Sequence, residues 1–519
     1  MPFLALDLGT SSVKVVLCND QGQILSSATA EYPLHQPHPG WSEQHPDDWW
    51  NASANAIRRT LASAATVLSV PQADIAASIH AVGLSGQMHG SVFLDAHAPA
   101  SGGRASPLRP AILWNDQRTG PQCEAIQSIL GGRRACVEQL GNAPLPGFTL
   151  PKLMWVREHE PDTWRRVRHL LLPKDFIRFR LTGELATDVG DAGGVLLFDL
   201  HQRSWNTQVA EKLGIDPAVL PAVYESCAVT GQITPHAAAE TGLAPGTPVV
   251  AGSGDNQCAA AGSGIVSPGQ VLAVLGTSGV MYAHCEIPTP DLGEPPGRLQ
   301  TFCAPDGNAA APGQWCSTGC MLSAAGALAW CRSVIAPEVP FDVLMHEAES
   351  APPGCDGLLF LPYLTGERCP HPDPAARGGW IGLTARHTRA HLVRAVLEGV
   401  TFGMGQMLDL MRTAGVRVER IGLSGGGNRS ALWRQIQADV YGVPVCSTEG
   451  DESGSALGAA LLAGVGIARW PSLAAAAAES VRMTEMRDPQ SPEAYANVRA
   501  VYAGVYARLR EVFIELACG

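Results

Sequence analysis

The stretch Phe3-Leu-Ala-Leu-Asp-Leu-Gly-Thr-Ser-Ser-Val-Lys-Val-Val-Leu17 decides the fold. Two apolar runs flank a turn of small residues, a pattern typical of a β-hairpin. The same pattern returns later in the chain as Val271-Leu-Ala-Val-Leu-Gly-Thr-Ser-Gly-Val-Met-Tyr-Ala283. Because Leu-Gly-Thr-Ser is common to both turns, the sequence predicts two related hairpins.

A second pair of motifs supports a duplication. Val82-Gly-Leu-Ser-Gly86 follows the first hairpin, and Ile421-Gly-Leu-Ser-Gly425 follows the second. Two motifs in matching order favour a duplicated domain, with an insertion in the longer gap of the second half. Strands that alternate with helical stretches predict an α/β fold. We place the division between residues 1–262 and residues 263–519, where small residues and a Ser-Pro-Gly turn break the pattern.

Helices are predicted where apolar residues recur with the helical period. Two aspartates mark the start of the first of these helices, and a proline precedes the last. The predicted helices cover residues 47–67, 391–411, 430–441 and 494–516.

Composition excludes several classes of protein. Of the 519 residues, 46% are hydrophobic and 16% are charged, which supplies buried cores and excludes a disordered chain. The net charge of -12 argues against a nucleic-acid partner. The sequence has no apolar run long enough for a membrane span, no signal-peptide pattern and no zinc-ligand spacing among its 14 cysteines. We therefore expect a cytoplasmic protein with reduced thiols, no membrane partner and no P-loop, since no lysine precedes Ser or Thr.

The two hairpins differ at one informative position. Asp7 stands in the first hairpin where the second has Val274. A carboxylate at the end of a buried apolar strand costs free energy unless a partner uses it, and Mg²⁺ on a bound nucleotide is a suitable partner. The alternative is a turn aspartate that caps local backbone N–H groups.

The two Gly-Thr-Ser turns offer backbone N–H groups and hydroxyls to a phosphate ligand. Thr10 and Ser11 lie in the first turn, and Gly276, Thr277 and Ser278 lie in the second. Facing each other across a cleft, the turns would hold a polyphosphate from both sides. Taken singly, such turns usually only connect strands.

Asp255 is the candidate general base. The strand Pro248–Ala251 is followed by Gly-Ser-Gly, which removes the side chains that would shield the Asp255 carboxylate. An exposed carboxylate on a rigid strand-to-helix turn suits proton abstraction. The alternative is an ordinary N-cap of the small-residue helix that follows.

Polar side chains at the ends of two first-half strands predict a ligand site. Gln87 and His89 follow the strand Ala81–Leu84, and Trp114 and Asp116 follow the next apolar strand. Because α/β proteins bind ligands at such strand ends, a hydroxyl-rich ligand such as a sugar suits these groups. The alternatives are a structural turn with a satisfied histidine and a tryptophan that belongs to the core.

In the second half, a glycine-rich segment follows the strand Val418–Leu423. The residues of this segment are Gly425, Gly426, Gly427 and Asn428. Three glycines let the backbone approach a flat ligand closely, so we expect an adenine there. The small-residue segment Ser453–Gly458 is explained equally well by close packing of a helix on a strand.

Taken together, these motifs resemble those of the FGGY carbohydrate kinases over nearly the whole chain. The Gly-Gln-Met-His-Gly run at residues 86–90 is typical of the family members that act on xylulose. The motifs that carry the resemblance are Leu6-Asp-Leu-Gly-Thr-Ser11, Trp41-Ser-Glu-Gln44, Leu84-Ser-Gly-Gln-Met-His-Gly90, Ile112-Leu-Trp-Asn-Asp116, Leu172-Pro-Lys-Asp175, Gly252-Ser-Gly-Asp-Asn256, Leu275-Gly-Thr-Ser-Gly279, Gly366-Glu-Arg368, Ala395-Val-Leu-Glu-Gly399 and Gly425-Gly-Gly427.

The resemblance implies a fold and a set of site residues. It implies two actin/hexokinase-like (ribonuclease H-like) domains around a central cleft, each on a βββαβα core. In that fold Asp255 would be the catalytic base and Asp7 would support Mg²⁺. The implied sugar-binding residues are Gln87, Met88, His89, Trp114, Asp116 and Asn256. The implied ATP-binding residues are Thr10, Ser11, Gly276, Thr277, Ser278, Gly425, Gly426, Gly427 and Asn428.

The resemblance also implies an activity. We expect transfer of a phosphoryl group from ATP, with Mg²⁺, to D-xylulose, which gives D-xylulose 5-phosphate. A homodimer is expected from the family alone. One alternative is a kinase of the same family that acts on ribulose or an alditol. The other is a non-catalytic sensor of a sugar or a nucleotide, which fold alone does not exclude.

Overall fold

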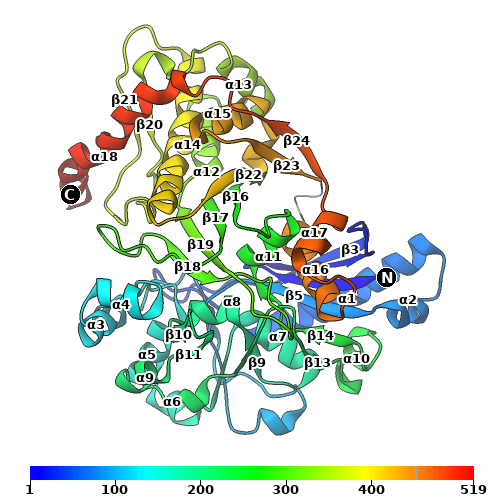
Figure 1. Ribbon diagram of the computed structural model, residues 1–519. Helices are drawn as coiled ribbons and strands as arrows, with labels where there is room; N and C mark the ends of the chain where they lie inside the picture. The colour runs from blue at the N-terminus through cyan, green and yellow to red at the C-terminus, as the bar shows by residue number, and fades with distance from the viewer. Residues whose placement is uncertain (450–452, 519) are drawn as a thin grey trace.

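Two mixed β-sheets form the framework of the computed structural model, which describes residues 1–449 and 453–518 (Figure 1). The first sheet has the strand order β13-β14-β5-β1-β2-β3, with β15 beside β5. Its strands are β1 (Phe3–Leu8), β2 (Ser12–Cys18), β3 (Ile24–Glu31), β5 (Ala81–Gly86), β13 (Val229–Gln232), β14 (Pro248–Val250) and β15 (Ser253–Gly254).

The second sheet has the strand order β18-β19-β17-β16-β22-β23-β24. Its strands are β16 (Gly269–Leu275), β17 (Gly279–Cys285), β18 (Gln300–Cys303), β19 (Trp315–Met321), β22 (Val418–Ser424), β23 (Val445–Thr448) and β24 (Met483–Arg487).

The two sheets repeat the same strand pairing. The central strand β1 pairs antiparallel with β2 and parallel with β5, as β16 pairs with β17 and with β22. The register sets Asp7 beside Ser85 and Val274 beside Ser424. The predicted duplication of an α/β core is therefore confirmed, and Asp7 and Val274 occupy equivalent positions.

Helices cover both sheets and build a lobe beside the first one (Figure 1). The helices before the second sheet are α1 (Pro46–Leu68), α2 (Gln72–Ser78), α3 (Gly120–Leu130), α4 (Arg133–Leu140), α5 (Thr149–His159), α6 (Pro161–Arg166), α7 (Pro173–Thr182), α8 (Val189–Ala192), α9 (Thr207–Lys212), α10 (Pro235–Thr241) and α11 (Asp255–Gly262). Those that follow are α12 (Ala325–Ile335), α13 (Phe341–Ala348), α14 (Arg389–Thr413), α15 (Ala431–Tyr441), α16 (Gly454–Gly466), α17 (Leu473–Ser480) and α18 (Glu493–Cys518). The predicted helices correspond to α1, α14, α15 and α18 within two residues at each end.

Short elements connect this framework. The small strand pairs are β4 (Glu43–Gln44) with β7 (Ala111–Ile112), β6 (Val92–Leu94) with β8 (His169–Leu171), β9 (Ala186–Asp188) with β12 (Ala222–Tyr224), β10 (Phe198–Asp199) with β11 (Ser204–Trp205), and β20 (Leu359–Leu361) with β21 (Gly379–Ile381). The 3₁₀ helices are η1 (Pro99–Ser101), η2 (Gly193–Val195), η3 (Pro217–Val219), η4 (Cys355–Gly357) and η5 (Gly426–Arg429). Of the helices in the described ranges, none is long and apolar enough to cross a bilayer.

The helix α16 packs on the first sheet although it follows the second in sequence. Figure 1 shows the orange helices α16 and α17 beside the blue strands of the first sheet. A side chain at Gly83 of β5 would overlap the carbonyl oxygen of Ala459, and one at Gly458 would overlap the carbonyl oxygen of Cys258. Close packing thus accounts for the small residues of Ser453–Gly458. The predicted division at residue 262 stays a prediction.

Candidate active site

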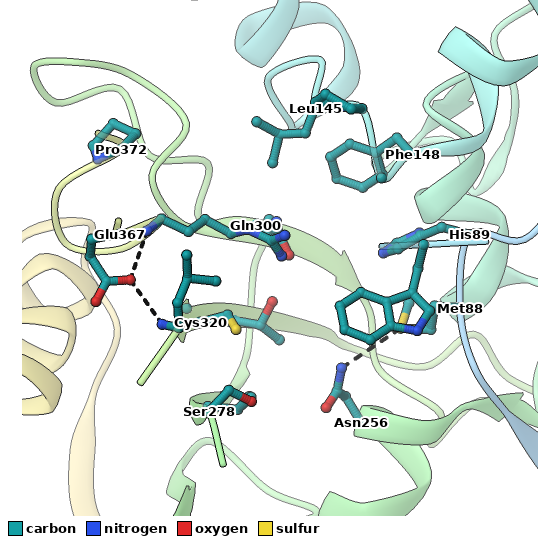
Figure 2. Close-up of a pocket in the computed structure, with 18 of the residues that line it drawn as sticks. Met88, His89, Leu145, Phe148, Asn256, Ser278, Gln300, Cys320, Glu367 and Pro372 are labelled. Carbon is teal, nitrogen blue, oxygen red and sulfur yellow. Dashed lines mark hydrogen bonds between the residues drawn. The ribbon is translucent and has the colours of Figure 1, made fainter. Parts of the chain in front are cut away.

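A cavity of about 710 Å³ lies between the two halves of the chain. In the view of Figure 2, His89 and Phe148 stand at one side and Glu367 and Pro372 at the other, with Gln300 between them. The residues that line it from the first half include Met88, His89, Trp114, Arg133, Phe148, Asp255 and Asn256. Those from the second half include Ser278, Val280, Gln300, Thr318, Cys320, Glu367 and Arg368. The structure thus brings predicted residues of both halves to one space.

Asp255 lies in this cavity as the first residue of α11, directly after β15. The N-cap position belongs to Gly254, so Asp255 is not the cap of the helix; its Oδ1 accepts the N–H of Asn256 at 2.8 Å. Burial, followed by the charge of Asp7, raises the pKa of Asp255 to about 7. A carboxylate that titrates near neutral pH is matched to the work of a general base.

Asp7 lies near the end of β1, behind Asp255. Its Oδ1 accepts a hydrogen bond from Ser85 Oγ at 2.9 Å. Burial raises the pKa of Asp7, whereas the Ser85 hydrogen bond and the charge of Lys14 oppose that change. Within the described ranges no group of three His, Cys, Asp or Glu side chains is placed to hold a metal ion. A single carboxylate fits Mg²⁺, because Mg²⁺ is usually bound by one or two carboxylates together with phosphates and water.

His89 presents a neutral imidazole to the cavity. Its backbone has a positive φ of 66°, and its carbonyl oxygen accepts hydrogen bonds from Lys152 Nζ at 2.8 Å and Thr149 Oγ1 at 3.0 Å. Burial and the charges of Lys152 and Arg368 lower the pKa of His89 to about 3. The ring packs edge-on against Phe148 at 4.8 Å. A neutral imidazole offers one donor and one acceptor, as a polyol requires.

Two further predicted sugar-binding residues border His89 and the base. Asn256 donates its amide to the sulfur of Met88 at 4.0 Å, which leaves its carbonyl oxygen for a ligand. Trp114 is 37% exposed, and its Nε1 donates to Thr10 Oγ1 at 3.0 Å. This hydrogen bond joins the predicted sugar site to the first Gly-Thr-Ser turn.

Gln87 and Asp116 lie one layer behind the cavity. Gln87 is buried and donates to Gln44 Oε1 at 3.1 Å. Asp116 is also buried; it accepts the N–H of Ser42 at 2.6 Å and pairs with Arg118 at 2.7 Å. Because both side chains contact protein groups, the structure does not bring them to the cavity wall, and their contact with substrate stays a prediction.

The second Gly-Thr-Ser turn is held by the start of α12. The N–H groups of Ala324 and Ala325 donate to the carbonyl oxygens of Thr277 and Gly276, each at 2.8 Å. The turn also closes on itself, since Gly276 donates to the carbonyl oxygen of Ser278 at 3.1 Å. Ser278 lines the cavity. In the first turn, Ser11 is exposed and accepts the N–H of Tyr32 at 3.2 Å.

The glycine-rich segment lies over the end of β16. Gly425 has a φ of 89°, and a Cβ there would lie 2.6 Å from the carbonyl oxygen of Leu275. A Cβ at Gly427 would lie 2.8 Å from the Leu275 side chain, whereas one at Gly426 would meet nothing within 4 Å. Asn428 donates to the carbonyl oxygen of Leu423 at 2.9 Å. Two glycines therefore serve packing, and Gly426 presents open backbone.

Sequence reasoning missed a buried charged cluster beneath Asp255. Lys174 lies 2.6 Å from Asp175 and 2.8 Å from Asp188, and Asp191 completes the cluster. Asp188 Oδ2 accepts hydrogen bonds from Ser226 Oγ at 2.7 Å and Ser253 Oγ at 2.9 Å. Ser253 precedes Asp255 by two residues, so this network fixes the segment that carries the base. The one motif of the sequence analysis that falls in this cluster is Leu172-Pro-Lys-Asp175. It contributed to the family resemblance, but no role was assigned to its residues.

Comparisons with known proteins agree with this geometry. The family model "FGGY family of carbohydrate kinases, N-terminal domain" matches residues 3–262, and the corresponding C-terminal domain model matches residues 271–467. A relative named xylulose kinase from Bacillus subtilis is 37% identical over 98% of this chain and 97% of its own length. Another xylulose kinase, from Escherichia coli, is 37% identical over 98% of this chain and 99% of its own. The crystal structure of xylulose kinase from Rhodospirillum rubrum has a TM-score of 0.88 at 28% identity and covers 99% of this chain and 100% of its own.

Proposed function

This chain belongs to the FGGY family of carbohydrate kinases, and on that premise we propose that it phosphorylates the terminal hydroxyl of D-xylulose. The observation that carries the proposal is the position of Asp255, a carboxylate with a pKa of about 7 in a cavity lined by both halves. The 37% identity to relatives named xylulose kinase, over nearly the whole chain, supports D-xylulose as the acceptor.

The proposed chemistry is an in-line displacement. The terminal hydroxyl of the sugar gives its proton to Asp255 while its oxygen forms a bond to the γ-phosphorus of ATP. The bond between that phosphorus and the bridging oxygen breaks, and ADP leaves with the electron pair. Asn256 and His89 orient the sugar so that one hydroxyl meets the carboxylate. The products are ADP and D-xylulose 5-phosphate.

The two Gly-Thr-Ser turns would hold the phosphates. Backbone N–H groups aimed at the transferring group stabilise the charge that develops there. Asp7, with water, would hold Mg²⁺, which neutralises phosphate charge when bound. The open backbone at Gly426 is the proposed contact for the nucleotide base. Closure of the cavity would exclude water, which otherwise competes as a phosphoryl acceptor.

The test of the proposal is a substrate panel. ADP release is measured with ATP, Mg²⁺ and one of D-xylulose, L-xylulose, D-ribulose, glycerol, xylitol or D-arabinitol, beside a blank without sugar. The highest kcat/KM with D-xylulose supports the proposal. Preference for another member of the panel keeps the family and the role of Asp255 but rejects D-xylulose as the substrate.

A further inference from the structure

One wall of the cavity, from the second half of the chain, carries polar groups that the mechanism above does not use. Arg368 and Gln300 both line the cavity. Within the described residues, neither the guanidinium of Arg368 nor the side-chain amide of Gln300 forms a hydrogen bond or an ion pair with another protein group. Both side chains are partly exposed at the cavity surface, where a ligand can replace the water around them.

The backbone of Arg368 is held firmly although its guanidinium is not. Glu367 Oε1 accepts the N–H of Arg368 at 2.7 Å and the N–H of Leu322 at 3.0 Å, which ties this turn to the end of β19. Burial raises the pKa of Glu367 to about 8, whereas backbone N–H groups and the charge of Arg368 oppose that change. The structure therefore anchors the backbone of Arg368, while its guanidinium has no hydrogen-bond or ion-pair partner within the described residues.

A second arginine of the same cavity shows the contrast. Arg133 also lines the wall, but its Nε donates to the carbonyl oxygen of Pro296 at 2.6 Å and its Nη2 to that of Gly297 at 3.3 Å. These bonds join α4 to the segment before β18. Arg133 is thus occupied by the protein, whereas Arg368 is available to a ligand.

Glu367, which precedes Arg368 in the chain, stands across the cavity from His89 in Figure 2, with Gln300 between them. Arg368 lines the same cavity, and its charge helps to lower the pKa of His89. Gln300 opens β18 and pairs with Thr318 of β19, and both residues line the cavity. A sugar whose terminal hydroxyl meets Asp255 would therefore extend its other end toward Arg368 and Gln300.

We propose that Arg368 and Gln300 bind the carbonyl end of an open-chain ketose and so set the preference of the enzyme for a ketose over a polyol. A guanidinium has only donors, and a ketone oxygen has only acceptor sites. A polyol has a hydroxyl at the same carbon. The proton of that hydroxyl needs an acceptor of its own, which the guanidinium of Arg368 cannot supply. The inference rests on the proposed function and names the residues that recognise the far end of its substrate.

The test compares a ketose with its reduced forms in the full-length protein. Arg368→Met and Gln300→Leu are measured with D-xylulose, xylitol and D-arabinitol, and a polyol that is not turned over is measured as a competitive inhibitor. Loss of one charged hydrogen bond predicts a ~10- to 100-fold fall in kcat/KM for D-xylulose in Arg368→Met. We expect the polyol constants to fall less than the ketose constant, because the hydroxyl of a polyol must also place its own proton beside the donor. The KM for ATP should change by less than about 3-fold, since ATP does not use this contact. Gln300→Leu should show the same pattern with a smaller effect.

The matched control is Arg377→Met. Arg377 lies in the same loop, and its Nη1 donates to the carbonyl oxygens of Ala375 and Ala376 at 3.0 and 3.1 Å. This variant should retain the ketose preference, and thermal denaturation should show that all variants fold.

Equal losses with ketose and polyol, or a raised KM for ATP, would instead make Arg368 a phosphate ligand and overturn the inference. An unchanged ketose preference would overturn it too. If the wild-type enzyme prefers another ketose, the variants are compared on that ketose and its polyol. The assignment of D-xylulose then fails, while the inference on Arg368 is still tested. Absence of turnover with every sugar would overturn both proposals.

Discussion

The two sheets share their strand pairing but differ in what stands at the strand ends. In the first half, the strand ends carry charged or polar side chains: Asp7 near the end of β1, His89 after β5 and Asp255 after β15. In the second half, the position of Asp7 is taken by Val274, and the segment after β22 is made of glycines. Equivalent positions thus offer charge on one side and open backbone on the other. We infer that a duplicated framework can divide two roles between its halves through single residues at strand ends.

The sharpest test of this division is Asp255→Asn. Loss of a positioned general base predicts a ~10²- to 10⁴-fold lower kcat, with the sugar KM less affected because the amide keeps the shape of the side chain. Steady-state kinetics with the preferred sugar measures both constants. Asp216→Asn is the matched control, since this exposed aspartate only caps a short helix by accepting the N–H of Ala218 at 3.0 Å. A kcat near that of the wild type in Asp255→Asn would remove this residue from the mechanism.

Asp7→Asn tests the position at which the two hairpins differ. Loss of one charged contact to Mg²⁺ predicts a roughly 10- to 100-fold lower kcat and a higher Mg²⁺ concentration for half-maximal rate. A Mg²⁺ titration of the rate checks this. The double variant Asp7→Asn/Val274→Asp moves the carboxylate to the equivalent position of the other sheet. Recovery of the rate in the double variant would show that the two positions are interchangeable and would break the comparison.

The pH dependence tests the coupling between the two carboxylates. A general base must be ionised, so kcat/KM should fall as the pH drops below the Asp255 pKa of about 7. Removing the charge of Asp7 lowers that pKa, so Asp7→Asn should shift the acidic limb to lower pH. The pH profiles of kcat/KM for both proteins check this prediction. An acidic limb that does not move in Asp7→Asn would rule out coupling of the two groups.

The same pKa has a consequence for stability. Because the pKa of Asp255 is raised from its ordinary value of 3.8 to about 7, the folded protein loses stability as the pH rises through this range, and the loss then stays constant. Asp255→Asn removes this cost, so its Tm should be higher than that of the wild type at pH 8 and close to it at pH 4. Calorimetry at the two pH values measures the difference. Equal Tm values at pH 8 would contradict the raised pKa.

The smallest effect is expected at the open glycine of the second half. Gly426→Ala should leave Tm unchanged, because its Cβ meets nothing within 4 Å, and should raise the KM for ATP by about 2- to 5-fold through contact with the nucleotide. Gly425→Ala is the contrast: its φ of 89° and the nearby Leu275 carbonyl predict a loss of about 1–3 kcal/mol in stability. Nucleotide kinetics and thermal denaturation separate the two. A changed Tm in Gly426→Ala would contradict the open space.

Local sequence patterns predicted the framework and several of the residues that line the cavity. The repeated hairpins and the four helices are specified by residues that are close in sequence, so the strand pairing and these helices were predictable. Asp255, His89 and Trp114 line the cavity, as expected from their positions after strand ends. Gln87 and Asp116 also follow strand ends, but their side chains form hydrogen bonds with Gln44 and Arg118 behind the cavity wall. The direction in which a side chain of such a turn points depends on its tertiary contacts, and the local sequence does not specify these contacts.

The features that the sequence did not predict are formed by segments that are distant in the chain and adjacent in the fold. The cluster around Lys174 joins residues from α7, β9 and α8, and the cavity brings Arg368 of the second half together with His89 of the first. Small residues at 453–458 indicated close packing but not the surface against which they pack. The first sheet receives α16 only because the chain returns from the second.

The position of α16 has a consequence for the order of events during synthesis. The strands β1 and β5 are complete once residue 86 has been made, but their cover spans residues 454–466. The ribosome adds residues at ~5–20 per second, so this apolar face would wait roughly 20 seconds or longer for its helix. The first sheet can therefore gain its complete cover only when nearly the whole chain has emerged.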